Sequence, residues 1–302
     1  MEGEPPESQE SFESRTVWIF GSPRSGSTWL LGMLSNHPLV VPMNEPTVGY
    51  HLSPFLHNEP GYRPEDLEFG NFTIRKVMEG DSAKFFAAEH SDVWLPGLRR
   101  LINDRLRAHV ERNPLRRAES GSILVVKEPN GSQAADVIMQ AQPEASLLFL
   151  LRDGRDVVDS ELASFEVGGW LERHFPHMKG VAPEDRLDFV TRSAYGWLWR
   201  TESVQAAFAA HDGKKLTIRY EEMLATPEEH LAQIYDWMGI PLSPEEVKRV
   251  TDQLAFERLK KTGKGEFNRS ASPGAWRQNL LPEEQEAVER AIGPKLRELG
   301  YD

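Results

Sequence analysis

Cysteine is absent from the 302 residues of this chain. The absence excludes disulfide bonds, thiolate zinc sites and a cysteine nucleophile. Because disulfides persist mainly in oxidising compartments, a chain without cysteine is typical of a reducing environment, and we expect a cytoplasmic location.

Long hydrophobic runs are absent too. The longest strand-like apolar stretch is SLLFLL at residues 146–151, far short of the roughly 20 residues that a membrane-spanning helix needs. We therefore expect a soluble protein without membrane insertion. Residues 1–14 lack the basic start and apolar stretch of a secretory signal. They predict a disordered acidic tail, followed by a single domain over residues 15–302.

Basic residues are too few to balance the acidic ones. The chain has 35 lysines and arginines against 47 aspartates and glutamates, and its formal net charge is −12. A molecule with this charge repels polyanions, so we expect no nucleic-acid partner. Any anion that the protein binds must be held in a local pocket.

Strand-like and helix-like segments alternate along the chain. β-branched and aromatic runs predict strands at residues 16–21, 122–127, 146–152 and 215–220. Helical spacing of apolar residues predicts helices at residues 25–38, 92–113, 132–142, 153–165 and 184–210, with two more from 227 and 243. The alternation predicts an α/β fold with three layers, a central parallel sheet flanked by helices, and ligands beyond the carboxyl ends of the strands.

The prediction also specifies a buried helix face, a strand pairing and a loop region. The helix over 92–113 should bury a stripe that includes Leu98, Leu101 and Ile102, and the strands at 122–127 and 146–152 should form a βαβ unit. Residues 39–78 are rich in Pro, Gly, His and Asn, so we expect a functional loop region with substrate contacts there.

A glycine-rich turn joins the first strand to the first helix. Gly21 and Gly26 have the spacing of the nucleotide loop G-x-x-x-x-G-K-[ST], but Ser27 occupies the lysine position and the cation is Arg24. Backbone N–H groups and the helix N-terminus converge in such a turn, so an anion belongs there. An ATP-dependent enzyme needs the lysine on its phosphates, and its loss disfavours a P-loop kinase. A non-catalytic nucleotide-binding protein, or a turn without a ligand, stays open as an alternative.

The segment GSPRSGSTW at residues 21–29 resembles the 5′-phosphosulfate loop of sulfotransferases that use 3′-phosphoadenosine 5′-phosphosulfate (PAPS). The resemblance extends from Thr16 to Tyr301 and implies a P-loop-like sulfotransferase fold, PAPS as the donor and PAP as its product. It implies that the following residues hold the 5′-phosphate: Arg24, Ser25, Gly26, Ser27 and Thr28.

Two further segments resemble the family's 3′-phosphate site. LLRDGRDVVDSELASF places Arg152 and Ser160 in the paired positions that clamp this phosphate, and FNRSASPGAWRQNL implies a third contact from Arg269. Gly274, Trp276 and Arg277 match the same loop, whereas Ser270 and Ala271 stand where the cytosolic enzymes have Lys and Gly. The resemblance also implies adenine contacts from three aromatic residues: Trp29, Tyr195 and Phe256.

Sulfuryl transfer leaves negative charge on the departing nucleotide, and Arg24 and Lys127 at the predicted strand ends are placed to neutralise it. This scheme requires no metal, and the nine histidines are scattered. Proline at position 129 replaces the histidine base of the cytosolic small-molecule branch. VVKEP instead resembles the K-D-P stretch of tyrosylprotein sulfotransferases.

That resemblance implies a glutamate base after the first helix, which falls on Glu45. Glu128 is the rival base, although strand alternation should turn it away from the face of Lys127, and His51 and His57 are further alternatives. We expect a small-molecule hydroxyl acceptor, which could be a phenol, sugar, lipid or natural product. Residues 166–183, with Trp170, Phe175 and Met178, could line its pocket. The oligomeric state is left open.

Overall fold

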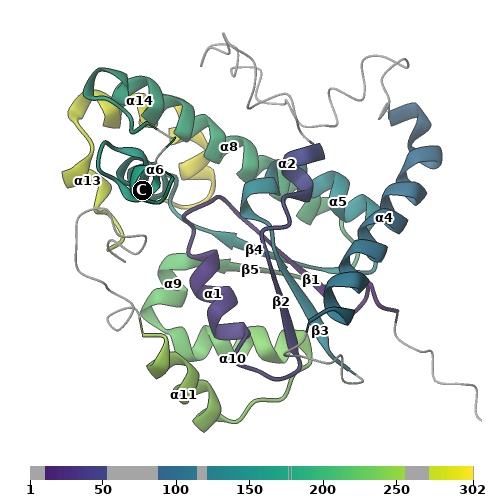
Figure 1. Cartoon of the computed structure of the whole chain (residues 1–302). Helices are drawn as coiled ribbons and strands as arrows, with labels where there is room; N and C mark the ends of the chain where they lie inside the picture. Colours follow the sequence, from purple (N-terminus) through teal and green to yellow (C-terminus); the bar gives the residue numbers. More distant parts are fainter. Residues whose placement is uncertain are drawn as a thin grey trace, which may run out of the picture.

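The computed structural model describes residues 11–52, 88–113, 121–175, 177, 179–255 and 272–301. Its centre is a five-stranded parallel sheet with the strand order β2-β3-β1-β4-β5 (Figure 1). The strands are β1 Thr16–Phe20, β2 Val40–Asn44, β3 Ile123–Lys127, β4 Ser146–Leu151 and β5 Lys215–Arg219. The predicted α/β fold with a central parallel sheet is confirmed.

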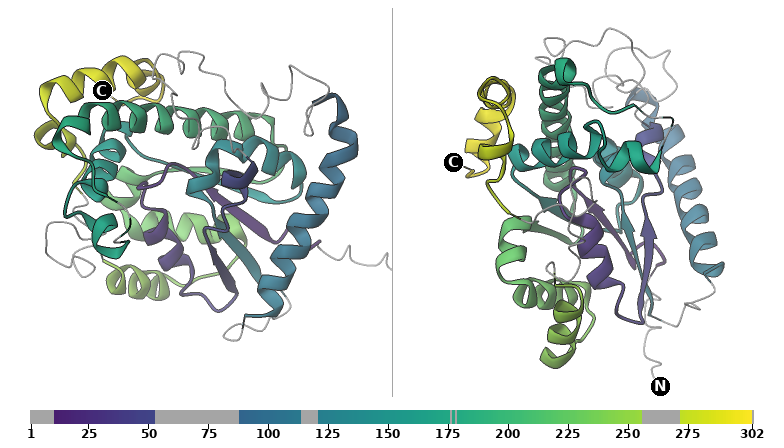
Figure 2. Two further views of the ribbon diagram at one scale, coloured as in Figure 1. Left: turned by 45° about the horizontal axis from the view of Figure 1, so that its top comes forward. Right: turned by 60° about the vertical axis from the view of Figure 1, so that its left-hand side comes forward.

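Side chains alternate between the two faces of the sheet, and each face has its own helix layer (Figure 2). Trp18 and Phe20 of β1 join one core, whereas Val17 and Ile19 join the other. The first core includes α4 Ser91–Glu111, α5 Ala135–Ala141, α6 Gly154–Phe165, α8 Arg186–Ala210 and α14 Pro282–Glu298. The second includes α1 Ser27–Leu34, α9 Tyr220–Ala225, α10 Pro227–Met238 and α11 Pro244–Gln253.

Short elements complete the described chain, and most of them lie close to the carboxyl ends of the strands or to the ends of the longer helices. They are α2 Val48–Leu52, α7 Trp170–His174, α13 Trp276–Asn279 and the 3₁₀ turns η3 Ala88–His90, η4 Pro129–Ala134 and η5 Pro183–Asp185. Within the described ranges, no helix is both long and apolar enough to cross a membrane.

The beginning of the predicted loop region is instead a strand. Val40–Asn44 forms β2, which pairs in parallel with β3 at one edge of the sheet. Pro42 has no N–H to donate to a sheet, but an edge strand tolerates this loss on its outer side. The predicted βαβ unit is present, because β3, α5 and β4 follow one another and the two strands are parallel in one sheet; β1 lies between them.

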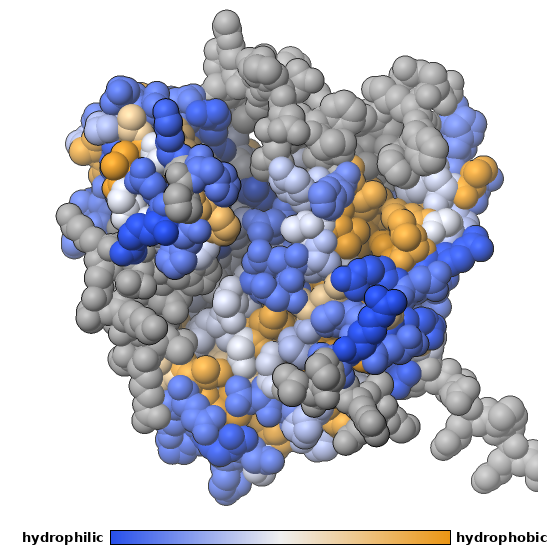
Figure 3. Space-filling view, viewed as in Figure 1, coloured by the Kyte–Doolittle hydropathy of each residue, from blue (hydrophilic) through white to orange (hydrophobic). Residues whose placement is uncertain are grey.

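Helix α4 differs in one position from its predicted buried stripe. Leu98 and Ile102 are buried, whereas Leu101 is 66% exposed. Figure 3 shows hydrophobic surface beside α4. The predicted helical spacing is confirmed, but fewer apolar residues of α4 are buried than the sequence predicts. Only one side of α4 packs against the core.

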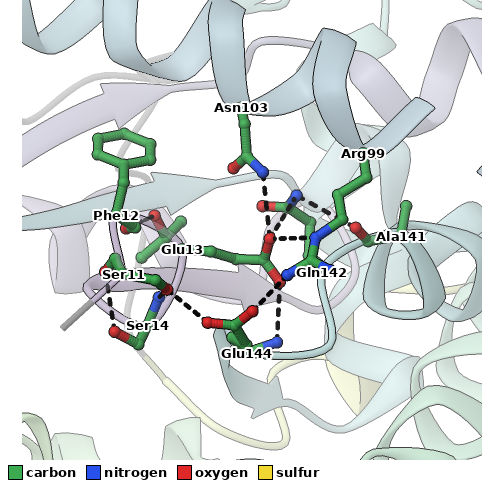
Figure 4. Close-up of polar contacts among 10 residues, drawn as sticks. Ser11, Phe12, Glu13, Ser14, Arg99, Asn103, Ala141, Gln142 and Glu144 are labelled. Carbon is green, nitrogen blue, oxygen red and sulfur yellow. Dashed lines mark hydrogen bonds and ion pairs between the residues drawn. The ribbon is translucent and has the colours of Figure 1, made fainter. Parts of the chain in front are cut away.

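The predicted acidic tail extends too far into the chain. Residues 12–15 form a turn beside α4 (Figure 4). Glu13 in this turn is only 3% exposed. Its Oε2 accepts hydrogen bonds from Arg99 Nε at 2.8 Å and Asn103 Nδ2 at 3.1 Å, and Oε1 accepts from the backbone N–H of Glu144 at 2.8 Å. Because its charge is matched inside the protein, this acidic residue belongs to the folded body.

Candidate active site

The turn over residues 21–28 joins β1 to α1, and its shape depends on glycine. A Cβ at Gly21 would lie 2.2 Å from the carbonyl oxygen of Leu150, and one at Gly26 would lie 2.5 Å from the ring of Tyr220. Gly26 and Arg24 have left-handed backbone conformations, with φ of 86° and 66°. The turn therefore packs close to β4 and opens toward the N-terminus of α1, a geometry that suits an anion.

Lys127 connects this turn to Glu45. Lys127 ends β3 and is 1% exposed; its Nζ donates to Thr28 Oγ1 at 2.8 Å and pairs with Glu45 Oε1 at 2.7 Å. Asn130 Nδ2 donates to Glu45 Oε2 at 2.9 Å, and the N–H of Glu45 donates to the carbonyl of Lys127 at 2.8 Å. The Glu45 carboxylate is thus held by Lys127 at the end of β3 and by Asn130 just after it.

Glu128, the rival base, directly follows Lys127 and has different contacts. It is fully buried, and its Oε2 accepts the backbone N–H of Thr47 at 2.9 Å. Burial raises the pKa of its carboxyl to about 7. Glu45 lines a cavity of about 430 Å³, whereas Glu128 is not among its lining residues.

Arg152 follows β4 and contacts the turn from the opposite side. Its Nη1 donates to the carbonyl of Arg24 at 2.6 Å, and its guanidinium lies 4.4 Å from the ring centre of Tyr220. Arg24 Nε donates to Ser160 Oγ at 3.0 Å. Arg24 therefore contacts both predicted residues of the 3′-phosphate clamp, Arg152 through its carbonyl and Ser160 through its side chain.

Aromatic residues border the turn. The rings of Trp29 and Tyr220 meet edge to face with centres 6.3 Å apart, and Trp29 Nε1 donates to the carbonyl of Leu254 at 2.8 Å. Tyr195 lies on α8 and does not line the cavity. Phe256 and Arg269, two further predicted cofactor contacts, lie outside the described residues.

The segment after residue 271 is tied to α6 through two aspartates. Asp156 accepts the backbone N–H of Gly274 at 2.8 Å, and Asp159 accepts Asn279 Nδ2 at 2.9 Å. Two guanidinium groups contact the Trp276 ring, that of Arg155 at 4.6 Å and that of Arg277 at 4.5 Å from the ring centre. Gly274 and Trp276 do not line the cavity, although Ser272 and Ala275 beside them do.

These groups surround one cavity of about 430 Å³. The cofactor-type residues and the Glu45 carboxylate both line it, together with an apolar wall from α6 and α7. The lining includes Arg24, Gly26, Ser27, Thr28, Trp29, Glu45, Asn130, Arg152, Ser160, Phe165, Trp170, Leu171, Arg200 and Tyr220. In the part of the chain that the structure describes, no cluster of His, Cys, Asp and Glu could hold a metal ion.

Comparison with known proteins identifies the family. A family model described as the sulfotransferase family matches residues 16–244, well over half of the chain. The chain belongs to the sulfotransferase family. The match confirms the resemblance that the 21–29 segment indicated and makes the protein a transferase.

Curated relatives of this sulfotransferase are distant. Cytosolic sulfotransferase 17 of Arabidopsis thaliana is 24% identical, over 82% of this chain and 87% of the relative. Nodulation protein NoeE of Sinorhizobium fredii is 26% identical over 94% of this chain, which spans 65% of the length of NoeE.

Solved sulfotransferases share the fold. A mouse sulfotransferase complexed with PAP has a TM-score of 0.55 at 14% identity, over 94% of this chain and 85% of that one. Retinol dehydratase in complex with androsterone and PAP has a TM-score of 0.51 at 18% identity, over 94% and 81% of the two chains. At these identities the likeness concerns the fold alone.

Sequence reasoning missed several lining residues of this sulfotransferase, among them Tyr220, Asn130 and Arg200. Tyr220 was placed at the end of a predicted strand, and its position beside the turn depends on β5 lying next to β4. Asn130 follows Lys127 and Glu128 in the sequence, but only the position of Glu45 reveals its partner. Arg200 lies on the long helix α8, whose pattern indicated packing alone.

Proposed function

We propose that this sulfotransferase moves the sulfuryl group of PAPS to a hydroxyl group of a small-molecule acceptor and releases PAP. The observation that supports this most is the contact chain from Thr28 through Lys127 to Glu45. It connects a turn suited to a phosphate with a carboxylate that can take a proton, and both line the same cavity.

The residues of the cavity fit a nucleotide with two separate phosphates. The 21–28 turn offers backbone N–H groups to one anion. Arg152 offers a second site, because its Nε is buried and has no hydrogen-bond partner among the described residues. A buried donor without a partner costs free energy that an anionic ligand would recover. We assign the 3′-phosphate to Arg152 and Ser160, with Arg269 as a further contact, and the adenine to Trp29 and Phe256. Tyr195 does not line the cavity and receives no contact in this proposal.

Each catalytic role falls to a side chain with a defined position. PAPS supplies the sulfuryl group, and the acceptor oxygen forms its new bond to sulfur as the sulfur–oxygen bond to the nucleotide breaks. Glu45 accepts the proton of the attacking hydroxyl. Lys127 and Arg24 stabilise the negative charge that develops on the leaving side, so we propose that no metal is needed.

Ligand binding tests this proposal against the two alternatives. Thermal unfolding should be measured with PAP, 5′-AMP and ATP, with and without Mg²⁺. We expect PAP to raise the melting temperature most. A Mg²⁺-dependent effect of ATP would favour a kinase-like enzyme, and PAP binding without a sulfated product from any acceptor would favour a non-catalytic nucleotide-binding protein. A cytoplasmic location, which the cysteine-free composition favours, stays a prediction.

A further inference from the structure

One charged side chain of the cavity has no role in the proposed mechanism. Arg200 of α8 is half-buried, and its Nε is sealed from solvent without a hydrogen-bond partner. Within the described residues, its guanidinium forms neither a hydrogen bond nor an ion pair. An arginine stays protonated in proteins, so the charge persists in the cavity.

The other charged side chains that line the cavity all have polar partners within the protein. Each has a hydrogen-bond or ion-pair partner: Arg24, Glu45, Arg152, Asp156, Asp159 and Glu161. Removing a guanidinium from water without a partner is costly, because the lost hydration is not replaced. Among the described residues, Arg152 and Arg200 both keep a buried Nε without a partner. Because Arg152 is assigned to the 3′-phosphate, Arg200 is the cation that is left for a second anionic group.

The surroundings of Arg200 leave its donors available. Burial lowers its pKa, and the negative charge of Glu161 opposes that shift. The Glu161 carboxylate accepts the hydroxyl of Ser193 and does not come within ion-pair distance of Arg200. Gly196, one turn earlier on α8, leaves space for the guanidinium, because a Cβ there would lie 3.1 Å from Arg200 Nη1.

The cavity also offers an apolar wall. Phe165 at the end of α6, and Trp170 and Leu171 of α7, line it together with Arg200. The phosphates of the nucleotide have proposed partners elsewhere, at the 21–28 turn and at Arg152. A ligand that uses this wall and Arg200 needs an apolar body and a separate anionic group.

We propose that Arg200 binds a carboxylate of the acceptor, and that the protein therefore sulfates hydroxy acids in preference to neutral alcohols. This inference rests on the proposed function and narrows its acceptor class. A guanidinium can hold a carboxylate through two parallel hydrogen bonds, which fixes the orientation of the acceptor as well as its affinity.

Matched acceptors test this inference. 4-Hydroxyphenylacetate and ω-hydroxydodecanoate should each be compared with the corresponding primary amide, which keeps the hydroxyl and the body and removes the charge. Binding to the PAP-loaded protein is measured by calorimetry, and sulfation with PAPS is measured by mass spectrometry. The proteins are the wild type, Arg200→Gln, Arg200→Lys and the control Arg192→Gln, which changes an exposed arginine of the same helix.

We expect the wild type to prefer at least one acid over its amide by roughly 10–100-fold, the usual worth of a hydrogen bond to a charged group. Arg200→Gln should abolish the preference, Arg200→Lys should keep part of it and Arg192→Gln should keep all of it. The preference is the ratio of acid binding to amide binding in the same protein. A smaller fraction of folded protein lowers both values equally and leaves this ratio unchanged.

Three outcomes would overturn the inference: a wild type without preference for either acid, a wild type that binds none of the four compounds, or an Arg200→Gln variant that keeps the preference. If PAP binds and amides are sulfated as well as acids, the proposed function stands and this inference fails. If PAP does not bind the wild type, the proposed function fails, and the inference fails with it.

Discussion

Replacing Glu45 with glutamine is expected to lower the turnover rate by roughly 10²–10⁴-fold, the usual contribution of a positioned base. Glutamine has nearly the same shape, and its carbonyl oxygen can still accept the hydrogen bond from Asn130. It cannot take the proton of the acceptor hydroxyl. PAP affinity should be unchanged, because Glu45 is not one of the proposed nucleotide contacts.

The same substitution has a smaller, calculable effect on stability. Lys127 is 1% exposed, and Glu45 Oε1 lies 2.7 Å from its Nζ. Breaking a fully buried ion pair costs about 3–5 kcal/mol. The Glu45 side chain is 33% exposed, so solvent screens the pair, and we expect the free energy of unfolding to fall by about 1–3 kcal/mol. Urea denaturation measures this change.

The comparison that tests Glu45 uses turnover and PAP binding in the same preparation. Glu128→Gln and His51→Ala are the rival variants, and both should keep most of the wild-type turnover. Near-normal turnover of Glu45→Gln, together with a large loss in a rival variant that still binds PAP, would refute the assignment of the base.

Three further predictions concern the phosphate sites and the buried carboxyl. Arg152→Ala should reduce the preference for PAP over 5′-AMP by roughly 10–100-fold in calorimetric titration, because it removes a charge-assisted contact; an unchanged preference would contradict the 3′-phosphate assignment. Lys127→Ala should lower turnover more than it weakens PAP binding, because the charge that it meets grows in the transition state; equal losses would make it a binding residue only. Glu128 has a pKa raised by burial from 4.5 to about 7, so the folded state holds more protons than the unfolded state between these values, and stability should fall as pH rises through that window. Urea denaturation at pH 5 and pH 8 should show a decrease of about 2.5 kcal/mol in the wild type relative to Glu128→Gln; parallel profiles would contradict it.

The sequence predicts those parts of the site that follow strands with clear apolar patterns. Residues 16–21, 122–127 and 146–152 are strongly β-forming, and the glycine turn, Lys127 and Arg152 follow them directly. Parallel strands bring their carboxyl ends to one edge of a sheet. The meeting of these groups at one edge of the sheet could therefore be predicted before the order of the strands was known.

Other parts of the site depend on contacts between distant segments. Tyr220 reaches the turn because β5 pairs with β4, and local sequence does not specify that pairing. Residues near Glu45 show the same dependence: Thr47 donates to Glu128, which is 81 residues later in the chain. The composition of residues 39–78 indicated a loop, but β2 tolerates Pro42 because it lies at the edge of the sheet, and local sequence does not specify that position.

Acceptor-dependent release of PAP tests the central claim most directly. The purified protein is incubated with PAPS and a broad metabolite mixture, and PAP and sulfated products are both quantified by mass spectrometry. The proposed mechanism predicts one PAP for each sulfated molecule. Without an acceptor, the protein should release no more PAP and form no more sulfated product than a control that lacks the protein. Release of PAP without a sulfated product would contradict it. So would transfer of phosphate to the same mixture in a parallel incubation with ATP in place of PAPS.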